Sequence, residues 1–209
     1  MAKILDGRAI SMKIMEEVIR DIEKIKAERG VVPGLSFITV GNDPASMIYV
    51  GAKKNACKEV GIYSEEFNLP EDAGKKMVIS VIEQMNEKRN IHAILLQLPL
   101  PTHLNPNEII QSINPEKDVD GFHPVNIGRM FVGSRGIQPC TPLGIMKLLE
   151  LTGVDLEGMD VVIVGSSIVV GKPLASLLLD RMATVTVCHI KTRDLKKKVS
   201  TADILISAA

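Results

Sequence analysis

The stretch DVVIVGSSIVVGKPLASLLLDRM, residues 160–182, decides the fold class of this chain. Val161–Val164 form an apolar run typical of a buried parallel strand, and Gly165 ends that run. From Lys172 onward the apolar residues recur with helical spacing. A strand, a glycine-containing turn and a helix in this order aim the first N–H groups of the helix at the strand end. The stretch therefore predicts a site that favours an anion such as a phosphate.

The residues after this stretch continue the alternation of strands and helices. We predict strands at TVTVCH (184–189) and DILISAA (203–209), with a helix at RDLKKKVSTA (193–202) between them. This βαβαβ order is one mononucleotide-binding half of a dinucleotide-binding fold. The last strand would leave an apolar sheet edge, so we expect either more chain or a partner beside it.

The glycine spacing leaves the role of the turn open. A Rossmann fingerprint reads G-x-G-x-x-G, whereas five residues separate Gly165 from Gly171 here, and Ser167 stands where the middle glycine would be. A Walker loop is excluded, because it needs four residues between its glycines and a Ser or Thr after the lysine, where this chain has Pro173. Either the turn binds a dinucleotide, or its glycines serve the local geometry alone.

The end of the second strand of this unit carries basic residues. A domain that binds NAD usually has Asp or Glu there for the ribose 2′-hydroxyl, but here Lys191 and Arg193 come before Asp194. Basic residues suit a 2′-phosphate, which favours NADP and leaves NAD possible. The alternative interpretation is that both are solvated charges at the start of a helix.

The N-terminal part of the chain predicts another α/β unit, so we expect two domains, residues 1–138 and 139–209. Apolar residues recur at helical spacing from Ala9 to Arg29 and stop at Gly30. Gly- and Pro-rich residues 113–142 are expected to form a long structured loop. The remaining predicted elements are strands at GLSFITV (34–40), SEEFNLP (64–70) and IHAILLQLPLP (91–101), and helices containing Tyr49, at KKMVISVIEQMNEKRN (75–90) and at LGIMKLLELTG (143–153).

Composition excludes several classes of function. Lys plus Arg equals Asp plus Glu at 25 each, so no basic field would attract nucleic acid or an anionic membrane. The N-terminal residues alternate charged and apolar types and predict neither a signal peptide nor a membrane span, which makes the cytoplasm the expected location. The three cysteines form no C-x-x-C pair and the four histidines show no ligand spacing, so we expect no metal site.

Tyr49 and Lys53, in YVGAKKNAC (49–57), are one helical turn apart and lie on one face of a predicted helix. A Tyr-x-x-x-Lys pair is also the catalytic pair of short-chain dehydrogenases, but there it follows the glycine turn, whereas here it precedes that turn. On its own, Lys53 is best interpreted as a solvated surface charge.

Five segments in order, however, closely resemble the bifunctional methylenetetrahydrofolate dehydrogenase/cyclohydrolase family. They are YVGAKKNAC (49–57), LLQLPLP (95–101), PEKDVDGFHPVNIGR (115–129), PCTPLGIMKLL (139–149) and VVIVGSSIVVGKPLASLL (161–178). The resemblance covers essentially the whole chain. It implies an N-terminal three-layer α/β catalytic domain that binds folate and a C-terminal Rossmann-type dinucleotide-binding domain.

The resemblance also implies roles for individual residues. Lys53 matches the general acid/base lysine of the family, Tyr49 its active-site tyrosine, Gln97 its glutamine and Asp120 its pterin-binding aspartate. Without the family, Asp120 would be interpreted as a loop residue that caps its own turn before Gly121. The implied reaction is oxidation of 5,10-methylenetetrahydrofolate by a nicotinamide cofactor, then hydrolysis of the methenyl product to 10-formyltetrahydrofolate. A homodimer is also implied.

The cofactor positions implied by the resemblance are Gly165, Ser166, Ser167, Ile190 and Lys191. Two of them depart from the commonest family pattern, because Ser166 replaces an arginine of G-R-S and Ile190 replaces the serine of C-H-S. The family also continues past residue 209, so we expect the cofactor domain to be incomplete here. Two alternatives follow: a truncated folate-binding fragment without turnover, and a cyclohydrolase without useful dehydrogenase activity.

Overall fold

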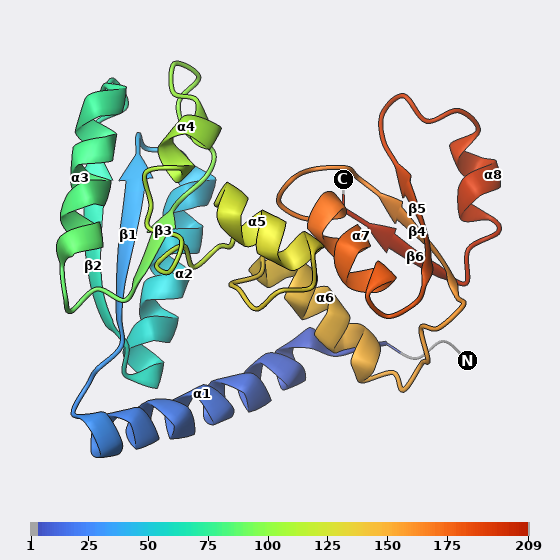
Figure 1. Cartoon of the computed structure of the whole chain (residues 1–209), viewed down its shortest axis with the longest axis horizontal. Coiled ribbons are helices and arrows are strands. Elements are labelled where there is room, and N and C mark those ends of the chain that lie inside the picture. The colour runs from blue at the N-terminus through green and yellow to red at the C-terminus, as the bar shows by residue number, and fades with distance from the viewer. Residues whose placement is uncertain (1–3, 209) are drawn as a thin grey trace. The chain divides into compact units, whose positions relative to one another are not determined.

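The computed structural model describes residues 4–208, and the chain divides into two compact units. The first unit is Asp6–Val119, and the second consists of the residues from Asp120 onward together with Ile4 and Leu5 (Figure 1). The predicted domain boundary between residues 138 and 139 stays a prediction. Each unit holds a three-stranded parallel sheet with helices packed on it, so the predicted α/β class with two parallel sheets is confirmed.

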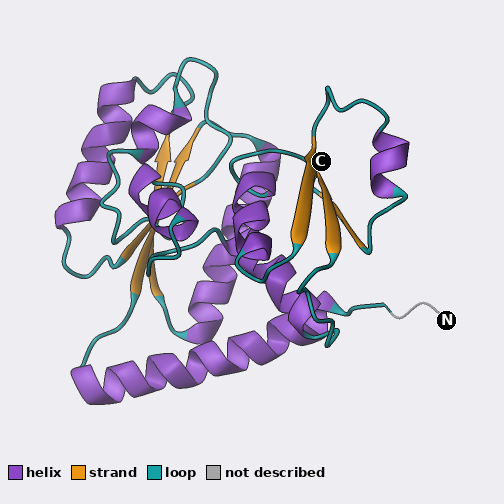
Figure 2. Cartoon of the chain, turned by 45° about the vertical axis from the view of Figure 1, so that its right-hand side comes forward, coloured by secondary structure: helices purple, strands orange, loops and turns teal. Residues whose placement is uncertain are grey.

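In the first unit the strands lie in the order β2-β1-β3 (Figure 1), and all of them are parallel. Figure 2 shows these strands with helices around them. The elements are α1 (Gly7–Arg29), β1 (Gly34–Val40), α2 (Pro44–Val60), β2 (Tyr63–Leu69), α3 (Lys75–Glu87), β3 (Ala93–Leu96) and α4 (Pro106–Ile110). Six of the seven β1 residues are buried, and consecutive strand residues point to opposite faces. Both faces of this sheet are therefore covered, as expected for parallel strands.

Local sequence explains where the first two helices begin and end. At the start of α1 the Asp6 carboxylate accepts from Arg8 N–H at 2.9 Å, and at its end Gly30 adopts a φ of +64°. The predicted stop at Gly30 is confirmed. At the start of α2, Asp43 accepts from Ser46 N–H and Pro44 occupies the first turn, where its missing N–H costs no hydrogen bond.

One face of β1 packs beneath α2. Phe37 of β1 and Leu95 of β3 form a buried cluster with Val50 and Cys57 of α2. The next residue along β1, Ile38, points to the other face and is fully buried too. Burying a large apolar side chain provides about 1.5–3 kcal/mol relative to exposing it, and the cluster beneath α2 fixes that helix on the sheet.

The second unit has the strand order β5-β4-β6, again parallel. Its elements are α5 (Pro124–Phe131), α6 (Cys140–Glu150), β4 (Asp160–Val164), α7 (Gly171–Leu179), β5 (Thr184–Cys188), α8 (Leu195–Val199) and β6 (Ile204–Ser207). Leu174 and Leu178 of α7 are fully buried against Val161 and Ile163 of β4 in one core cluster. The predicted βαβαβ order is confirmed.

The prediction of a loop for the whole of residues 113–142 is wrong, because α5 lies within it and α6 already begins at Cys140. His123 caps α5 by accepting from Val125 N–H at 3.1 Å, and Pro124 occupies the first turn. Asn126 and Met130, one turn apart, are both buried. The helix was missed because Pro124 and Gly128 resemble loop residues, while its stability comes from burial in the second unit.

The two glycines of the β4–α7 turn permit close contact between backbones. A Cβ atom at Gly165 would lie 2.3 Å from the carbonyl oxygen of Ala208, and the φ of Gly165 is +131°. A Cβ atom at Gly171 would lie 2.0 Å from the carbonyl oxygen of Gly165. Any other residue at either position would displace backbone, so both glycines are required by geometry.

On the surface of the first unit, β2 carries a charged cluster. Lys88 Nζ donates to both carboxylate oxygens of Glu65, at 2.7 and 2.6 Å, and Tyr63 Oη donates to the same carboxylate at 2.5 Å. The hydrogen bonds from Lys88, and next from Tyr63, hold the pKa of the Glu65 carboxyl below its ordinary value. Glu65 therefore stabilises the fold as an anion.

Replacing Gly171 with Ala is expected to destabilise the second unit by about 1–3 kcal/mol, because the added methyl group would collide with the Gly165 carbonyl. Gly144→Ala in α6 is the matched control, since nothing lies within 4 Å of its added Cβ. The control is expected to raise stability by up to about 1 kcal/mol. Urea unfolding followed by circular dichroism measures both, and equal midpoints for the two variants would contradict this account.

The Glu65 cluster predicts a pH-dependent stability term. Because the folded pKa of Glu65 is lowered, its contribution is complete above the unfolded value of about 4.3 and disappears as the pH falls through the folded value. Glu65→Gln should therefore cost up to about 1 kcal/mol at pH 7 and progressively less below pH about 4. Urea midpoints at pH 7, 5, 4 and 3 check this, and a difference from wild type that does not change with pH would refute it.

Candidate functional site

The structure brings Lys53 and Gln97 together, although they are 44 residues apart in the chain. Lys53 lies in the third turn of α2, and Gln97 directly follows the last residue of β3. Lys53 Nζ donates to Gln97 Oε1 at 3.2 Å, and Gln97 Nε2 donates to the carbonyl oxygen of Leu98 at 2.6 Å. The side chain of Gln97 is thus held from both ends, and it orients the lysine.

The elements that carry this pair are rigid. The N–H of Gln97 donates to the carbonyl oxygen of Ile38 at 2.9 Å, so the end of β3 is tied to β1. Val50 and Cys57 anchor α2 on the sheet from the positions three before and four after Lys53. Tyr49, one turn before Lys53, is 62% exposed. Its ring is accessible for stacking against a planar ligand close to the lysine.

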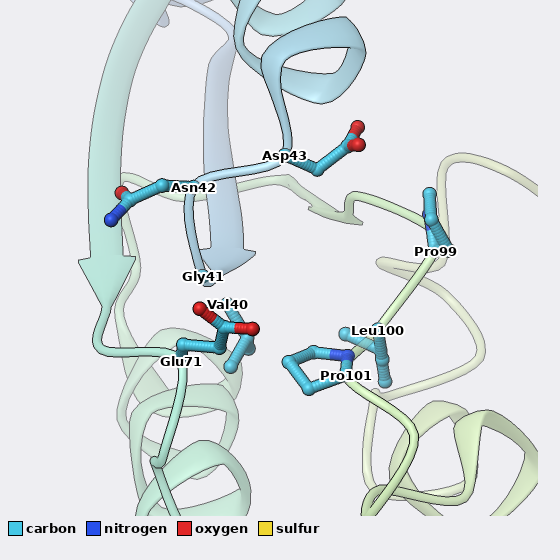
Figure 3. A pocket seen from close by; sticks show the side chains of 8 residues that line it. All are labelled: Val40, Gly41, Asn42, Asp43, Glu71, Pro99, Leu100 and Pro101. Atoms are coloured by element: carbon cyan, nitrogen blue, oxygen red, sulfur yellow. The ribbon is translucent and has the colours of Figure 1, made fainter.

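A pocket of about 300 Å³ lies at the carboxyl ends of the strands of this sheet (Figure 3). Three segments line it: Val40–Asp43 after β1, Glu71 after β2 and Pro99–Pro101 after β3. Ser46 N–H donates to Asp43 at 2.8 Å and holds the pKa of that carboxyl below its ordinary value. With Asp43 ionised and Glu71 opposite Pro101, the pocket favours hydrogen-bond donors over anions.

Asp120 is the first residue of the second unit and is partly buried. Gly121 follows with a φ of +68°, and a Cβ atom there would lie 2.9 Å from the backbone carbon of Gln138. The glycine therefore lets the chain turn tightly just after the carboxylate, beside residues 137–139. The predicted role of Asp120 in binding a pterin stays a prediction.

The predicted cofactor residues gather at the carboxyl ends of β4 and β5. Gly165 N–H donates to the carbonyl oxygen of Cys188 at 2.9 Å, which joins the two strand ends. Ser167 Oγ accepts from Val170 N–H at 3.1 Å and stabilises the turn before α7. Just after β5, His189 Nδ1 accepts from Lys191 N–H at 3.2 Å, while Ile190 is 97% exposed.

This arrangement fits a dinucleotide. In the sheet order β5-β4-β6, the chain passes from β4 to β5 on one side of β4 and then to β6 on the other side. The point where the strand order reverses therefore lies at the carboxyl end of β4. Ligands of open parallel sheets bind at that point. Because Gly165 and Gly171 have no side chain, the backbone of the turn lies close to the start of α7, whose N–H groups favour phosphate. Lys191 lies exposed after the neighbouring strand β5.

The histidines of the described residues have structural contacts. His92 Nδ1 accepts from Gly34 N–H at 3.0 Å, and His103 Nε2 lies 3.0 Å from the carbonyl oxygen of Ala73. Across residues 4–208, no group of three or more His, Cys, Asp or Glu is arranged to hold a metal ion. Within the same residues, no helix has the length and apolarity needed to cross a membrane.

Sequence reasoning missed two features of the first unit. The pocket was not predicted, although Asn-Asp-Pro after β1 and Pro-Glu-Asp after β2 mark the loops that line it. The second is Lys117, whose side chain donates to three backbone carbonyl groups at the end of α3. No local pattern signals such a contact, because its acceptors are backbone atoms about thirty residues earlier in the chain.

Comparison with known proteins identifies relatives over both units. Residues 5–120 match the catalytic domain of tetrahydrofolate dehydrogenase/cyclohydrolase, and residues 139–209 match the NAD(P)-binding domain of the same enzymes. The bifunctional protein FolD of Geotalea daltonii is 50% identical over 208 residues, which are 100% of this chain and 74% of that protein.

Solved structures agree with this match. The bifunctional FolD methylenetetrahydrofolate dehydrogenase/cyclohydrolase of Campylobacter jejuni has a TM-score of 0.96 and 46% identity, covering 99% of this chain and 73% of that one. The Trypanosoma brucei enzyme, whose structure contains NADP and an inhibitor, has a TM-score of 0.96 and 35% identity, with coverage of 100% and 72%. The family resemblance inferred from five sequence segments is confirmed, and this chain belongs to the tetrahydrofolate dehydrogenase/cyclohydrolase family.

Proposed function

We propose that this chain oxidises 5,10-methylenetetrahydrofolate with NADP and hydrolyses the product to 10-formyltetrahydrofolate. In the first reaction a hydride leaves the methylene carbon, and the folate becomes the methenyl cation. In the second reaction water adds to that carbon, one carbon–nitrogen bond of the bridge breaks, and one proton is released. The chemistry that the cofactor supplies is acceptance of the hydride.

The observation that carries this proposal is the hydrogen bond from Lys53 to Gln97 in a chain of this family. Gln97 is fixed by its contact with Leu98, so it holds Lys53 Nζ at one position at the end of β3. A lysine held in this way can transfer a proton to or from water and the folate nitrogens during hydrolysis. Lys53 is therefore proposed as the general acid/base, and Gln97 as the group that orients it.

Two further residues are proposed to bind the substrate. The exposed ring of Tyr49 offers a stacking surface for the planar part of the folate, one helical turn from Lys53. Asp120 is proposed to accept paired N–H bonds from the pterin, as a carboxylate does from an arginine. This role comes from the match of Asp120 to the aspartate of the family motif.

NADP is the proposed cofactor, with NAD as the alternative. Gly165, Ser166 and Ser167 would hold the phosphates at the start of α7, and Ile190 and Lys191 would lie beside the ribose. Lys191 and Arg193 are both exposed after β5 and carry the positive charge that a 2′-phosphate requires. The cytoplasmic location and the homodimer remain predictions from the sequence.

The direct test measures reduced cofactor at 340 nm when the protein meets 5,10-methylenetetrahydrofolate, with NADP and NAD in parallel reactions. Loss of methenyltetrahydrofolate absorbance measures the hydrolysis separately. We expect both activities, with NADP preferred. A folded sample that binds the folate without turnover would contradict the proposal, and hydrolysis without oxidation would restrict it to the cyclohydrolase reaction.

Replacing Lys53 with Met is expected to lower the rate of methenyltetrahydrofolate hydrolysis by at least about 100-fold, because the proton-transfer group is lost. Folate affinity should change by only a few fold, since Tyr49 and Asp120 remain. Lys58→Met is the matched control, because Lys58 is exposed on the same helix. Hydrolysis by Lys53→Met at the rate of the control would show that another group is the base.

Replacing Lys191 with Ala should raise the KM for NADP by about five- to tenfold and leave the KM for NAD unchanged, because only NADP carries the 2′-phosphate. Lys196→Ala, at an exposed lysine of α8, is the control for loss of positive charge in general. Steady-state kinetics with both cofactors decide the question. Equal effects on NADP and NAD would exclude a 2′-phosphate contact.

A further inference from the structure

The C-terminus of α3 lacks the usual means of satisfying its last carbonyl groups. The helix ends at Glu87 without a glycine in the left-handed conformation, and its last turn contains no basic residue. The carbonyl groups of the last turn of a helix have no partner within that helix. A group from elsewhere in the fold must therefore bind them, or water must do so.

Lys117 is that group. Its Nζ donates to the carbonyl oxygens of Met85, Asn86 and Lys88 at 3.0, 2.6 and 3.0 Å. A lysine ammonium has three donors, so these bonds account for all of them. Burial lowers the pKa of the Lys117 ammonium, while three charge-assisted bonds at the negative end of a helix offset that cost.

The backbone of the same residue is hydrogen-bonded to β3. The carbonyl oxygen of Lys117 accepts from Ile94 N–H at 2.6 Å, and Val119 N–H donates to the carbonyl oxygen of Ile94 at 3.4 Å. Asp118 thus forms a parallel bridge with Ile94 of β3. Residues 117–119 thus lie beside β3 through this isolated bridge, and the residue that follows β3 is Gln97.

Residues 117–119 also contact the core beneath the helix that carries Lys53. Val119 packs against the cluster of Phe37, Val50, Cys57 and Leu95. The side chain of Lys117 fixes one end of residues 117–119, and Val119 fixes the other. Asp120 follows Val119 directly in the chain, so its backbone starts from a position that these contacts determine.

We propose that Lys117 is a positioning residue for the folate reaction. By binding the end of α3, it holds residues 117–119 beside β3 and so fixes the position of the backbone where it enters Asp120. This inference rests on the proposed function. It assigns to the lysine of PEKDVDG a role that involves no contact with the substrate.

Kinetics of the full chain test the proposal with Lys117→Met, which keeps the apolar stem and removes the donors. We expect the KM for 5,10-methylenetetrahydrofolate to rise about tenfold, with the KM for NADP and kcat within about twofold. Lys76→Met is the matched control, because Lys76 is an exposed lysine in the first turn of the same helix, away from the carbonyl acceptors. A purely structural role would lower the active fraction without this selective change in KM.

Hydrogen exchange without substrate gives an independent measure. At the amide of Ile94, whose acceptor is the carbonyl oxygen of Lys117, exchange should be about tenfold faster in Lys117→Met than in Lys76→Met. If Lys117→Met fails to fold, Lys117→Gln replaces it, since its shorter side chain cannot reach three acceptors. A folate KM equal to that of the control, or unchanged exchange at Ile94, overturns the proposal. An inactive wild type would refute the proposed function, and the exchange result would still decide whether Lys117 holds the segment.

Discussion

Every strand of both sheets runs parallel to its neighbours, and this constraint decides where the candidate functional residues lie. Parallel strands have all their carboxyl ends at one edge, so loops that are distant in sequence meet there. In the first unit this edge collects the loop before α2, Glu71 and Gln97. In the second unit it joins the turn after β4 to the turn after β5 through the hydrogen bond between Gly165 and Cys188.

A parallel sheet is stable only when other elements cover both of its faces. In the first unit, α2 covers one of the two faces with Val50 and Cys57, and the same helix carries Tyr49 and Lys53 on another part of its surface. The burial that stabilises the sheet thereby also sets the position of the lysine. Gln97 then needs only one hydrogen bond to orient Nζ, since both backbones are already fixed.

Much of the fold could be predicted from the sequence, because apolar periodicity and capping residues are local signals. Gly30 as a helix stop and Val161–Val164 as a buried strand are examples. Helix α5 was not predicted, because Pro124 and Gly128 are residue types typical of loops and the helix is stabilised by burial in the second unit. The pairing of Lys53 with Gln97 was accessible only through resemblance to a family, because no spacing rule relates residues that meet through tertiary structure. The contacts of Lys117 with the end of α3 could not be predicted for the same reason.

The backbone contacts of the β4–α7 turn bear on how cofactor choice can change during evolution. Gly165 and Gly171 have almost no freedom to vary, since any side chain there would collide with main-chain atoms. The turn after β5 is different, because Ile190, Lys191 and Arg193 are exposed. Substitutions there disturb no core, so selection can explore them at little cost in stability. With the proposed cofactor site, a lineage could shift between the two nicotinamide dinucleotides by changing a few surface residues, while the glycine turn stays constant.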